Sequence, residues 1–328
     1  MSAETPLWRP SASLESLRLR ARLNKLIRDF FEERGVLEVE TPILSAHATV
    51  DRHIESFSTQ FHGPAYAGPR QRWLRTSPEF AMKRLLAAGY GDCYELGRVF
   101  RNGEAGARHN PEFTLLEWYR VGIDLSALMS EVADLIQAAL AMVGQTCSVR
   151  RITYADLFQQ GLDLDPHRAS IDQLISAAGD LQIGPQGLTR DDWLDLLITH
   201  RLQPQFQPDE LLLLYDYPAS QAALAKLHVV DGVQVAERFE AYLGPIELAN
   251  GYHELLDADE QERRFKAEQQ ARAEAGSVVP PFDKHLVESL RAGMPACSGV
   301  ALGMDRLVGR LIGRSKIAES IAFPSRGA

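Results

Sequence analysis

Charged side chains gather in one short run between two apolar stretches. The run FRNGEAGARHNPEF, residues 100–113, lies between the strand-like sequences YELGRV and TLLEWY. Polar residues are common in a loop that only turns the chain. Arginine, however, presents a rigid fork of donors that suits carboxylates and phosphates. Arg101, at the start of this loop, is therefore a candidate anion-binding residue.

A carboxylate follows among apolar residues. Leu115, Glu117 and Tyr119 share one face if TLLEWYRV is a strand. A buried carboxylate needs a partner that compensates its charge. That partner is either a local arginine, Arg98 or Arg101, in a structural ion pair, or a cation that the site binds.

Two further carboxylates occur in QVAERFEAYLGPIELANGYHELLD. If the chain turns at residues 243–245, Glu240 and Glu247 fall opposite each other on paired strands, with Cβ atoms about 4.5–5.5 Å apart. Like charges at that distance are tolerated where a hard cation such as Mg²⁺ lies between them and bridges to phosphate oxygens. An exposed acidic ladder is the structural alternative. Simple alternation places Glu254 on the other face unless a bulge intervenes.

A glycine-rich segment, SGVALGMDRLVGRL, leads into an apolar helix whose first turn carries Arg306. Helix N-termini attract phosphates through free N–H groups and the helix dipole, although such junctions are also common for packing reasons. Together, Arg101, Arg306 and the pair Glu240 and Glu247 suit a nucleoside triphosphate with magnesium, held without a P-loop.

Hydrophobic periodicity predicts the elements that position these residues. Residues 13–34 have the spacing of an amphipathic helix, with Ser13 as N-cap and Gly35 as its stop. Residues 36–44 alternate like a half-buried edge strand that ends near Pro42. Helices interspersed with hairpin strands favour an α+β fold, an antiparallel sheet flanked by helices. Further strands are expected within 93–121, 211–218 and 234–243, and further helices at 125–143, 150–210 and 257–275.

The composition is that of a globular protein. The chain has 328 residues, of which 45% are hydrophobic and 24% charged, and we expect one domain with 150–210 as a variable helical insertion. A net charge of -9 argues against binding nucleic acid or an anionic membrane by bulk charge. The sequence has neither a leader-like start nor an apolar run of about 18 residues, so we expect a cytoplasmic protein without membrane contact.

In order and spacing, three segments resemble the signature motifs of class II aminoacyl-tRNA synthetases. They are the helix and strand ending at Pro42, the loop 100–113 with its flanking strands, and GVALGMDRL. The likeness is closer to lysyl-tRNA synthetases, through TSPEF at 76–80, RHNPEFTLLEWY, and ELANGYHEL at 247–255. It covers nearly the whole chain apart from 150–210, and it implies the class II catalytic domain.

The first motif begins within fifteen residues of the start, whereas lysyl-tRNA synthetases carry an anticodon-binding domain before it. We therefore expect no such domain here. With DYPASQAALAKL at 216–227, the chain resembles the elongation factor P lysine ligases, truncated paralogues of lysyl-tRNA synthetases. That family implies a ligase that uses ATP and Mg²⁺ to form an aminoacyl-adenylate. It then transfers lysine, with (R)-β-lysine preferred, to a lysine ε-amine of elongation factor P, and motif 1 implies a homodimer.

The resemblance also assigns roles to single residues. Arg101 and Arg306 would be catalytic, and Glu240 and Glu247 would hold Mg²⁺. ATP would be bound by Arg101, Asn102, Gly103, Asn110, Phe113, Glu247, Leu248, Gly303 and Arg306. Lysine would be bound by Ser77, Glu79, Glu117, Tyr119, Asn250, Tyr252, Glu254 and Ala301. Tyr119 and Tyr252 could instead be plain core aromatic residues.

Two positions depart from the lysyl-tRNA synthetase pattern. Those enzymes have glutamate two residues after the loop arginine, whereas here Gly103 stands there and the acid is displaced to Glu104. Position 103 can then offer ATP only backbone groups. Ala301 stands where glycine is usual, and its methyl group would reshape the pocket floor near the substrate's amino end, which fits the implied preference for (R)-β-lysine.

Three other functions are compatible with the same motifs. A truncated enzyme that charges tRNA is the nearest, although the expected lack of an anticodon-binding domain makes tRNA an unlikely acceptor. A catalytically inactive regulatory paralogue would not need both arginines and both metal carboxylates. An amidating enzyme of the asparagine-synthetase kind would not need a pocket with carboxylates at both ends.

Overall fold

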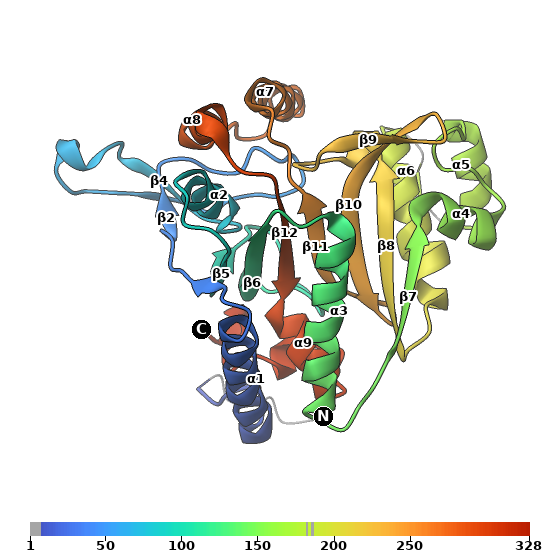
Figure 1. The fold of residues 1–328 in the computed structure, drawn as a ribbon, viewed down its shortest axis with the longest axis horizontal. Helices are drawn as coiled ribbons and strands as arrows, with labels where there is room; N and C mark the ends of the chain where they lie inside the picture. The colour runs from blue at the N-terminus through green and yellow to red at the C-terminus, as the bar shows by residue number, and fades with distance from the viewer. Residues whose placement is uncertain (1–7, 182, 185–186) are drawn as a thin grey trace. The chain divides into compact units, whose positions relative to one another are not determined.

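The computed structural model describes residues 8–181, 183–184 and 187–328 (Figure 1). The chain divides into two compact units, the first made of Met1–Ile123 with Leu256–Ala328 and the second of Asp124–Leu255. The expectation of one catalytic domain therefore stays a prediction. The expectation about a leader concerns the start of the chain, of which residues 1–7 lie outside the described residues.

The first unit begins with the predicted amphipathic helix, α1 (Leu14–Glu32). Ser13 caps it, because the Ser13 side chain accepts a hydrogen bond from the Ser16 N–H at 3.1 Å. Gly35 follows the helix at a φ of +67°, a conformation that glycine adopts without steric cost. Phe31 stacks on Tyr94 with ring centroids 4.4 Å apart and meets Trp118 edge-on, which anchors α1 in the core.

The single strand expected over 36–44 is wrong. The chain forms β1 (Leu37–Glu38), which pairs in parallel with β5 (Cys93–Phe100), and then β2 (Leu44–Ser45), which pairs with β4 (Gln71–Leu74) in a different sheet. Alternation cannot reveal this change of sheet. A third strand, β3 (Ser58–Gln60), pairs antiparallel with β4.

The main sheet of the first unit has the order β1-β5-β6-β12. The predicted strand-loop-strand unit is confirmed, since β5 pairs antiparallel with β6 (Glu112–Val121). On its other side β6 pairs antiparallel with β12 (Cys297–Gly303), which runs directly into α9 (Met304–Leu311). The other helices of this unit are α2 (Glu79–Ala87), α7 (Ala258–Glu274) and α8 (Lys284–Gly293), with 3₁₀ turns at Ala65–Ala67, Ile317–Glu319 and Ser325–Gly327.

The strands of the second unit follow the order β11-β10-β8-β7. Here β10 (Val233–Leu243) pairs antiparallel with β11 (Ile246–His253) and with β8 (Glu210–Pro218), while β7 (Ser148–Thr153) pairs in parallel with β8. The short β9 (Leu227–Val230) pairs with β10, and α3 (Leu125–Ala141) contacts β10 and β11.

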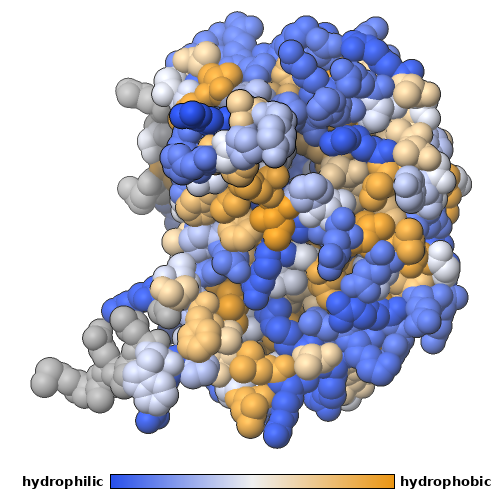
Figure 2. All heavy atoms as spheres, turned by 90° about the vertical axis from the view of Figure 1, so that its left-hand side faces the viewer, coloured by the Kyte–Doolittle hydropathy of each residue, from blue (hydrophilic) through white to orange (hydrophobic). Residues whose placement is uncertain are grey.

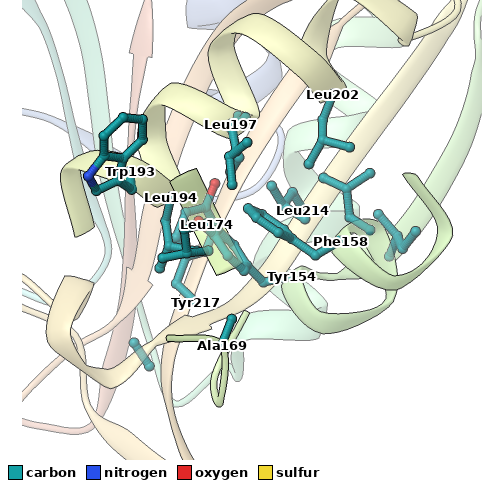
Figure 3. Close-up of a cluster of buried hydrophobic side chains, with 14 of the residues drawn as sticks. Tyr154, Phe158, Ala169, Leu174, Trp193, Leu194, Leu197, Leu202, Leu214 and Tyr217 are labelled. Atoms are coloured by element: carbon teal, nitrogen blue, oxygen red, sulfur yellow. The ribbon is translucent and has the colours of Figure 1, made fainter. Parts of the chain in front are cut away.

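The insertion at 150–210 is helical, as expected, and has a hydrophobic core. Its helices are α4 (Tyr154–Leu162), α5 (Ile171–Ala178) and α6 (Arg190–Leu197), followed by a π-helical turn Ile198–Leu202 and a 3₁₀ turn Gln203–Gln205. Figure 3 shows side chains of these helices pointing toward one another and toward β8. The buried residues include Tyr154, Phe158, Leu174, Trp193, Leu194, Leu197, Leu214 and Tyr217.

Antiparallel pairs prevail in both units, and β1–β5 and β7–β8 are parallel exceptions. The expected α+β architecture, antiparallel sheets with flanking helices, is confirmed. Across residues 8–181, 183–184 and 187–328, no helix combines the length and the apolar character needed to cross a membrane.

Candidate active site

Glu117 lies buried on β6 of the first unit. Its carboxylate accepts one hydrogen bond from the Ser77 hydroxyl and one from the Tyr119 hydroxyl, both at 2.7 Å. Ser77 in turn accepts a bond from the backbone N–H of Glu79 at 2.9 Å. The structure thus brings together four residues predicted to bind lysine, and the Tyr119 hydroxyl has a polar role that a plain core aromatic would lack.

Charge is concentrated around this carboxyl. Burial and the neighbouring charge of Glu79 raise the pKa of Glu117 to about 7, although the bonds from Ser77 and Tyr119 oppose the shift. Lys83, a buried residue of α2, lies with its Nζ 2.6 Å from Glu79 Oε1. A cation bound beside Glu117 would be stabilised because it would pair with a carboxylate that is costly to bury alone.

The structural alternative for Glu117, an ion pair with a nearby arginine of the hairpin, is wrong. Arg98 pairs with Glu112, at 3.6 Å, and Arg101 pairs with Glu104, at 3.4 Å. Arg98 is opposite Thr114 in the pairing of β5 with β6, so its place in the register is away from Glu117.

Ala301 is directly opposite Glu117 in the pairing of β12 with β6. Side chains opposite each other on antiparallel strands lie on the same face with Cβ atoms about 4.5–5.5 Å apart. The Ala301 methyl group is therefore a neighbour of the Glu117 side chain, where glycine would leave open space. Gly303, the last residue of β12, is opposite Leu115.

Arg101, in the loop between β5 and β6, is held by a ring of β6 and by a carboxylate of the loop. The Arg101 guanidinium lies over the Phe113 ring, 5.2 Å from its centroid, and its Nη1 is 3.4 Å from Glu104 Oε1. Gly103 has a φ of +82°, and a Cβ built there would meet no atom within 4 Å. The backbone therefore favours glycine at 103, and the displaced acid Glu104 pairs with Arg101 instead.

Asn102 and Asn110 fix the two ends of this loop. Asn102 N–H donates to the Glu55 carbonyl at 2.8 Å, while the Asn110 side chain donates to the Glu112 carbonyl at 2.6 Å. The Asn110 side-chain oxygen accepts from the Ser325 N–H at 2.9 Å. Both polar groups of the buried Asn110 amide thus have protein partners, and ATP binding by Asn110 stays a prediction.

Arg306 lies in the first turn of α9, as predicted, and contacts the same loop. Its Nη2 is 3.0 Å from His109 Nε2, and burial together with the positive charge of Arg306 lowers the pKa of His109. The preceding residue, Asp305, is buried and accepts from the Thr114 N–H at 2.8 Å, while its other oxygen pairs with Arg20 of α1. Asp305 thereby fixes the start of α9 against β6.

In the second unit, the pairing predicted for Glu240 and Glu247 is wrong. Glu240 is opposite Asn250, and Glu247 is opposite Tyr242, because the register shifts between Ala241 and Tyr242. The extra residue on β11 is Leu248, which is buried. Glu240 and Glu247 still lie on one face of the sheet, because Glu247 is opposite Tyr242, two residues after Glu240. They share that face because of the bulge, and not because they are directly opposite each other.

The same bulge settles the face of Glu254. Residues opposite each other share a face, so Glu247 lies on the face of Tyr242, and Asn250 on the face of Glu240. Tyr252 follows Asn250 by two residues, and Glu254 follows by four. Glu247, Asn250, Tyr252 and Glu254 therefore all project from one face, which simple alternation from Glu247 does not predict.

The Glu240 carboxylate has protein partners on both oxygens. Arg238 Nη2 donates to Oε1 at 2.5 Å, and the Tyr242 hydroxyl donates to Oε2. Arg238 Nε also donates to Asn250 Oδ1 at 3.2 Å, and Asn250 Nδ2 donates to the Tyr252 hydroxyl at 3.1 Å. Tyr252 thus joins a polar network, as a ligand-binding tyrosine would.

Glu240 and Glu247 are the residues that the family resemblance assigns to Mg²⁺. In the described ranges, no three or more histidine, cysteine, aspartate or glutamate side chains are grouped to hold a metal ion. Magnesium, however, needs only one or two carboxylates when substrate phosphates complete its coordination. Each oxygen of Glu240 accepts one hydrogen bond and retains a lone pair, so Glu240 fits that requirement, and Glu247 projects from the same face as Glu240.

Sequence reasoning missed several residues that fix the predicted ones. Lys83 could have been found from its spacing of four from Glu79 on a predicted helix, and Arg238 from its spacing of two from Glu240 on a strand. His109 stood within the loop that was singled out. The contact of Asp305 with Arg20 joins residues far apart in sequence, and no local pattern indicates it.

The fold and these motifs define a class. A family model described as tRNA synthetases class II (D, K and N) matches residues 6–327, so the chain belongs to this family. Among curated proteins, it is 47% identical over 98% of both chains to an elongation factor P--(R)-beta-lysine ligase of Yersinia enterocolitica. It is similarly related to proteins of the same name from Salmonella arizonae, at 47% identity, and Enterobacter sp., at 46%, again over 98% of each chain. The resemblance read from the motifs is confirmed.

Proposed function

We propose that this chain is an ATP-dependent ligase that attaches lysine, with (R)-β-lysine as the expected isomer, to elongation factor P. A carboxylate oxygen of the amino acid attacks the α-phosphorus of ATP, and the bond to the β-phosphate breaks with release of pyrophosphate. The ε-amine of a lysine of elongation factor P then attacks the acyl carbon. An amide forms, the amine loses a proton, and AMP leaves.

The surroundings of Glu117 support this proposal independently of the similarity to the relatives. Glu117 is a buried carboxyl with two neutral hydrogen-bond donors, Ser77 and Tyr119, and Ala301 stands opposite it in the sheet. Such a site suits an ammonium group, because the charge of the ligand compensates the buried carboxylate. A substrate without that amine would leave the carboxylate unpaired, so discrimination against it should be strong.

Arg101 and Arg306 are the residues we propose for the reacting phosphate groups. Arg101 would bridge the amino-acid carboxylate and the α-phosphate, and Arg306 would hold the distal phosphates. The Arg101 guanidinium lies over the Phe113 ring of β6, and Arg306 contacts His109 in the loop between β5 and β6. Donors fixed where charge develops typically contribute about 10²- to 10³-fold in rate.

Glu240 and Glu247 are the residues we propose for Mg²⁺. When bound, the ion would neutralise charge on the phosphates and polarise them toward attack. The contacts of Glu240 with Arg238 and Tyr242 fix its carboxylate plane before any ligand arrives. Asn250, Tyr252 and Glu254, on the same face, are assigned to lysine by resemblance to the family.

The loop tip from Glu104 to Arg108 is the segment we propose for contact with the acceptor. Its centre is held by the backbone, because the Ile317 N–H donates to the Ala107 carbonyl at 2.8 Å. A protein acceptor and a tRNA acceptor differ most at this contact, so the tip is where this enzyme should differ from enzymes that charge tRNA.

A homodimer is proposed through the surface near β1 and β2. Leu37, Ile43 and Leu44 are exposed large hydrophobic residues there. Figure 2 faces the side on which β2 and β4 lie in Figure 1 and shows hydrophobic side chains gathered among charged ones. Exposed apolar groups of this kind mark interaction surfaces. We also propose a cytoplasmic location, where elongation factor P and ATP are present together.

Pyrophosphate exchange with different lysine isomers tests the first step. We expect exchange with lysine, faster with (R)-β-lysine, and none with an analogue that lacks the side-chain amine. Ala301→Gly should shift the preference toward α-lysine, whereas Val300→Ala, a change at the neighbouring position on the opposite face, should not. Absence of exchange with every isomer would favour an inactive, regulatory protein.

A further inference from the structure

The helical insertion contacts two of the proposed site residues through one half-buried arginine, Arg238. Arg238 of β10 uses its guanidinium on three acceptors: Glu240 Oε1 at 2.5 Å, Asn250 Oδ1 at 3.2 Å and the Gln221 carbonyl at 2.8 Å. The guanidinium also lies over the Tyr217 ring, 4.4 Å from its centroid. A planar fork with contacts on its edge and its face can hold only one orientation.

The contact with Gln221 leads to the insertion. Gln221 and Ser220 belong to a 3₁₀ turn, Ala219–Gln221, after β8. Gln221 Nε2 donates to Asp195 Oδ1 at 2.9 Å, and the Ser220 hydroxyl donates to Asp191 Oδ1 at 2.7 Å. Both aspartates belong to α6, so this helix fixes the turn whose carbonyl receives Arg238.

The position of α6 is fixed by apolar packing. Trp193, Leu194 and Leu197 of this helix are buried in the cluster shown in Figure 3, together with Tyr154 and Tyr217. Tyr217 is also the ring under the Arg238 guanidinium. The insertion therefore supports Arg238 twice, through the Asp195–Gln221 hydrogen bond and through the Tyr217 ring.

On the other side, Arg238 decides how two site residues point. Its bond to Asn250 Oδ1 sets the orientation of that amide, which leaves Nδ2 to donate to the Tyr252 hydroxyl. Its bond to Glu240 Oε1, with the bond from Tyr242 to Oε2, fixes the carboxylate plane. Neither orientation follows from the strand pairing alone, because pairing places a side chain on a face without fixing its outer torsions.

We propose that Arg238 is the positioning residue through which the insertion holds Glu240 and Asn250 in the geometry that ligand binding needs. This inference rests on the proposed function for the roles of those two residues. The proposal assigns a role to the insertion at 150–210, because the hydrophobic core of the insertion fixes the residues that hold the Arg238 guanidinium. Lysine at 238 would keep the charge but could not reach all three acceptors in one plane.

Arg238→Lys and Arg238→Met test the inference in the full-length protein. For both variants we expect the dissociation constant for (R)-β-lysine, measured by calorimetry without turnover, to rise at least tenfold. The KM for lysine in pyrophosphate exchange should rise more than kcat falls. Asp195→Ala should show a smaller change in the same direction, because it removes the support of Gln221 and leaves Arg238 in place.

Arg151→Lys is the matched control. Arg151 of β7 is an arginine of the same unit whose guanidinium makes three hydrogen bonds, all to Ser126 and Ser130 of α3. If Arg238 has a merely structural role, Arg238→Lys should behave like Arg151→Lys: both substitutions should lower the melting temperature and leave the lysine affinity of the folded protein unchanged. That result would overturn the inference.

A crystal structure of the Arg238→Lys variant separates this inference from the proposed function. We expect the Asn250 amide and the Glu240 carboxylate to rotate away from the orientations described here, whichever reaction the enzyme catalyses. Unchanged orientations of both side chains would overturn the positioning role. If the wild-type protein binds no lysine isomer, the proposed function fails, and the crystal structure still decides the role of Arg238.

Discussion

Lys83 Nζ lies 2.6 Å from Oε1 of Glu79, one turn earlier on α2, and the lysine side chain is only 2% exposed. The two groups form a largely buried ion pair beside the Glu117 carboxyl, in which the Glu79 side chain is 15% exposed. Removing one partner of such a pair typically costs about 3–5 kcal/mol, since the other charge stays buried. Lys83→Met should therefore lower the free energy of unfolding by about that amount, as urea denaturation would measure.

The matched control for this substitution is Lys25→Met. Lys25 pairs with Asp29 at the same spacing of four residues, but on the exposed face of α1, so its loss should have little effect. The double variant Glu79→Gln with Lys83→Met should recover most of the loss, because no buried charge remains unpaired. If Lys83→Met is as mild as Lys25→Met, the buried pair does not stabilise this region.

Lysine binding should depend on the ionisation of Glu117. Burial and the charge of Glu79 raise its pKa to about 7, and an ammonium group pairs with the ionised form. Affinity for lysine should therefore strengthen as pH rises toward 7 and weaken by about tenfold for each pH unit below it. Calorimetric titrations between pH 5 and 8 would measure this.

The free energy of unfolding should change with pH in the opposite sense to the affinity for lysine. The folded state binds the Glu117 proton more tightly than the unfolded chain, whose pKa is near 4.5. The contribution of this group is therefore fully present below pH 4.5 and is lost as pH rises toward about 7. Glu117→Gln should abolish both trends, whereas Glu112→Gln, at an exposed position of the same strand, should keep them. An affinity that stays constant from pH 5 to 8 would refute the role of Glu117.

The family acid at position 103 should not be tolerated in this loop. Gly103 has a φ of +82°, where a side chain costs about 1–3 kcal/mol even in open space. Gly103→Ala and Gly103→Glu should therefore lower kcat/KM for ATP by similar factors of about 5- to 150-fold in pyrophosphate exchange. A Gly103→Glu enzyme as active as the wild type would show that this loop tolerates a carboxylate at position 103 and contradict the prediction.

Arg272 of α7 should be required to hold the loop that meets Asn102. Its buried guanidinium donates to four backbone carbonyls, those of Val50, Asp51, Ile54 and Val278, at 2.5–3.1 Å, and to the Glu55 side chain at 2.9 Å. The Glu55 carbonyl accepts from Asn102 N–H. Arg272→Met should cost about 4 kcal/mol of unfolding free energy, because these acceptors lose their partner.

Weakened ATP binding should accompany that loss of stability, since Asn102 is next to Arg101. Arg263→Met is the control on the same helix, because Arg263 is exposed and pairs only locally, with Glu260. Fluorescence titration with an ATP analogue and urea denaturation would compare the two variants. A destabilised Arg272→Met protein with wild-type affinity for ATP would show that the loop contact does not reach the site.

Local patterns predicted the parts of the site that depend on neighbours in sequence. The hairpin around residues 100–113 and the helix start at Arg306 follow from periodicity and turn residues, because these signals act over a few positions. The resemblance to the family then assigned roles that periodicity could not. The extended segment 36–44 was misjudged, since which sheet a short strand joins depends on partners far along the chain.

The remaining features depend on tertiary contacts. Alternation cannot locate the bulge at Leu248, because bulges are set by how both strands pack, and so it left the face of Glu254 open. The partners of Glu117 come from Ser77, 40 positions earlier, and those of Arg238 from a turn that the insertion fixes. Such contacts have no period in the sequence, although the residue types already signalled that a buried charge needed partners.

The central claim is that the acceptor is elongation factor P, and transfer of labelled lysine measures it most directly. The protein would be incubated with ATP, Mg²⁺ and labelled (R)-β-lysine, together with elongation factor P or with tRNA. We predict label on elongation factor P, none when its acceptor lysine is replaced by arginine, and none with Arg101→Ala or Arg306→Ala enzyme. Label on tRNA alone would contradict the account.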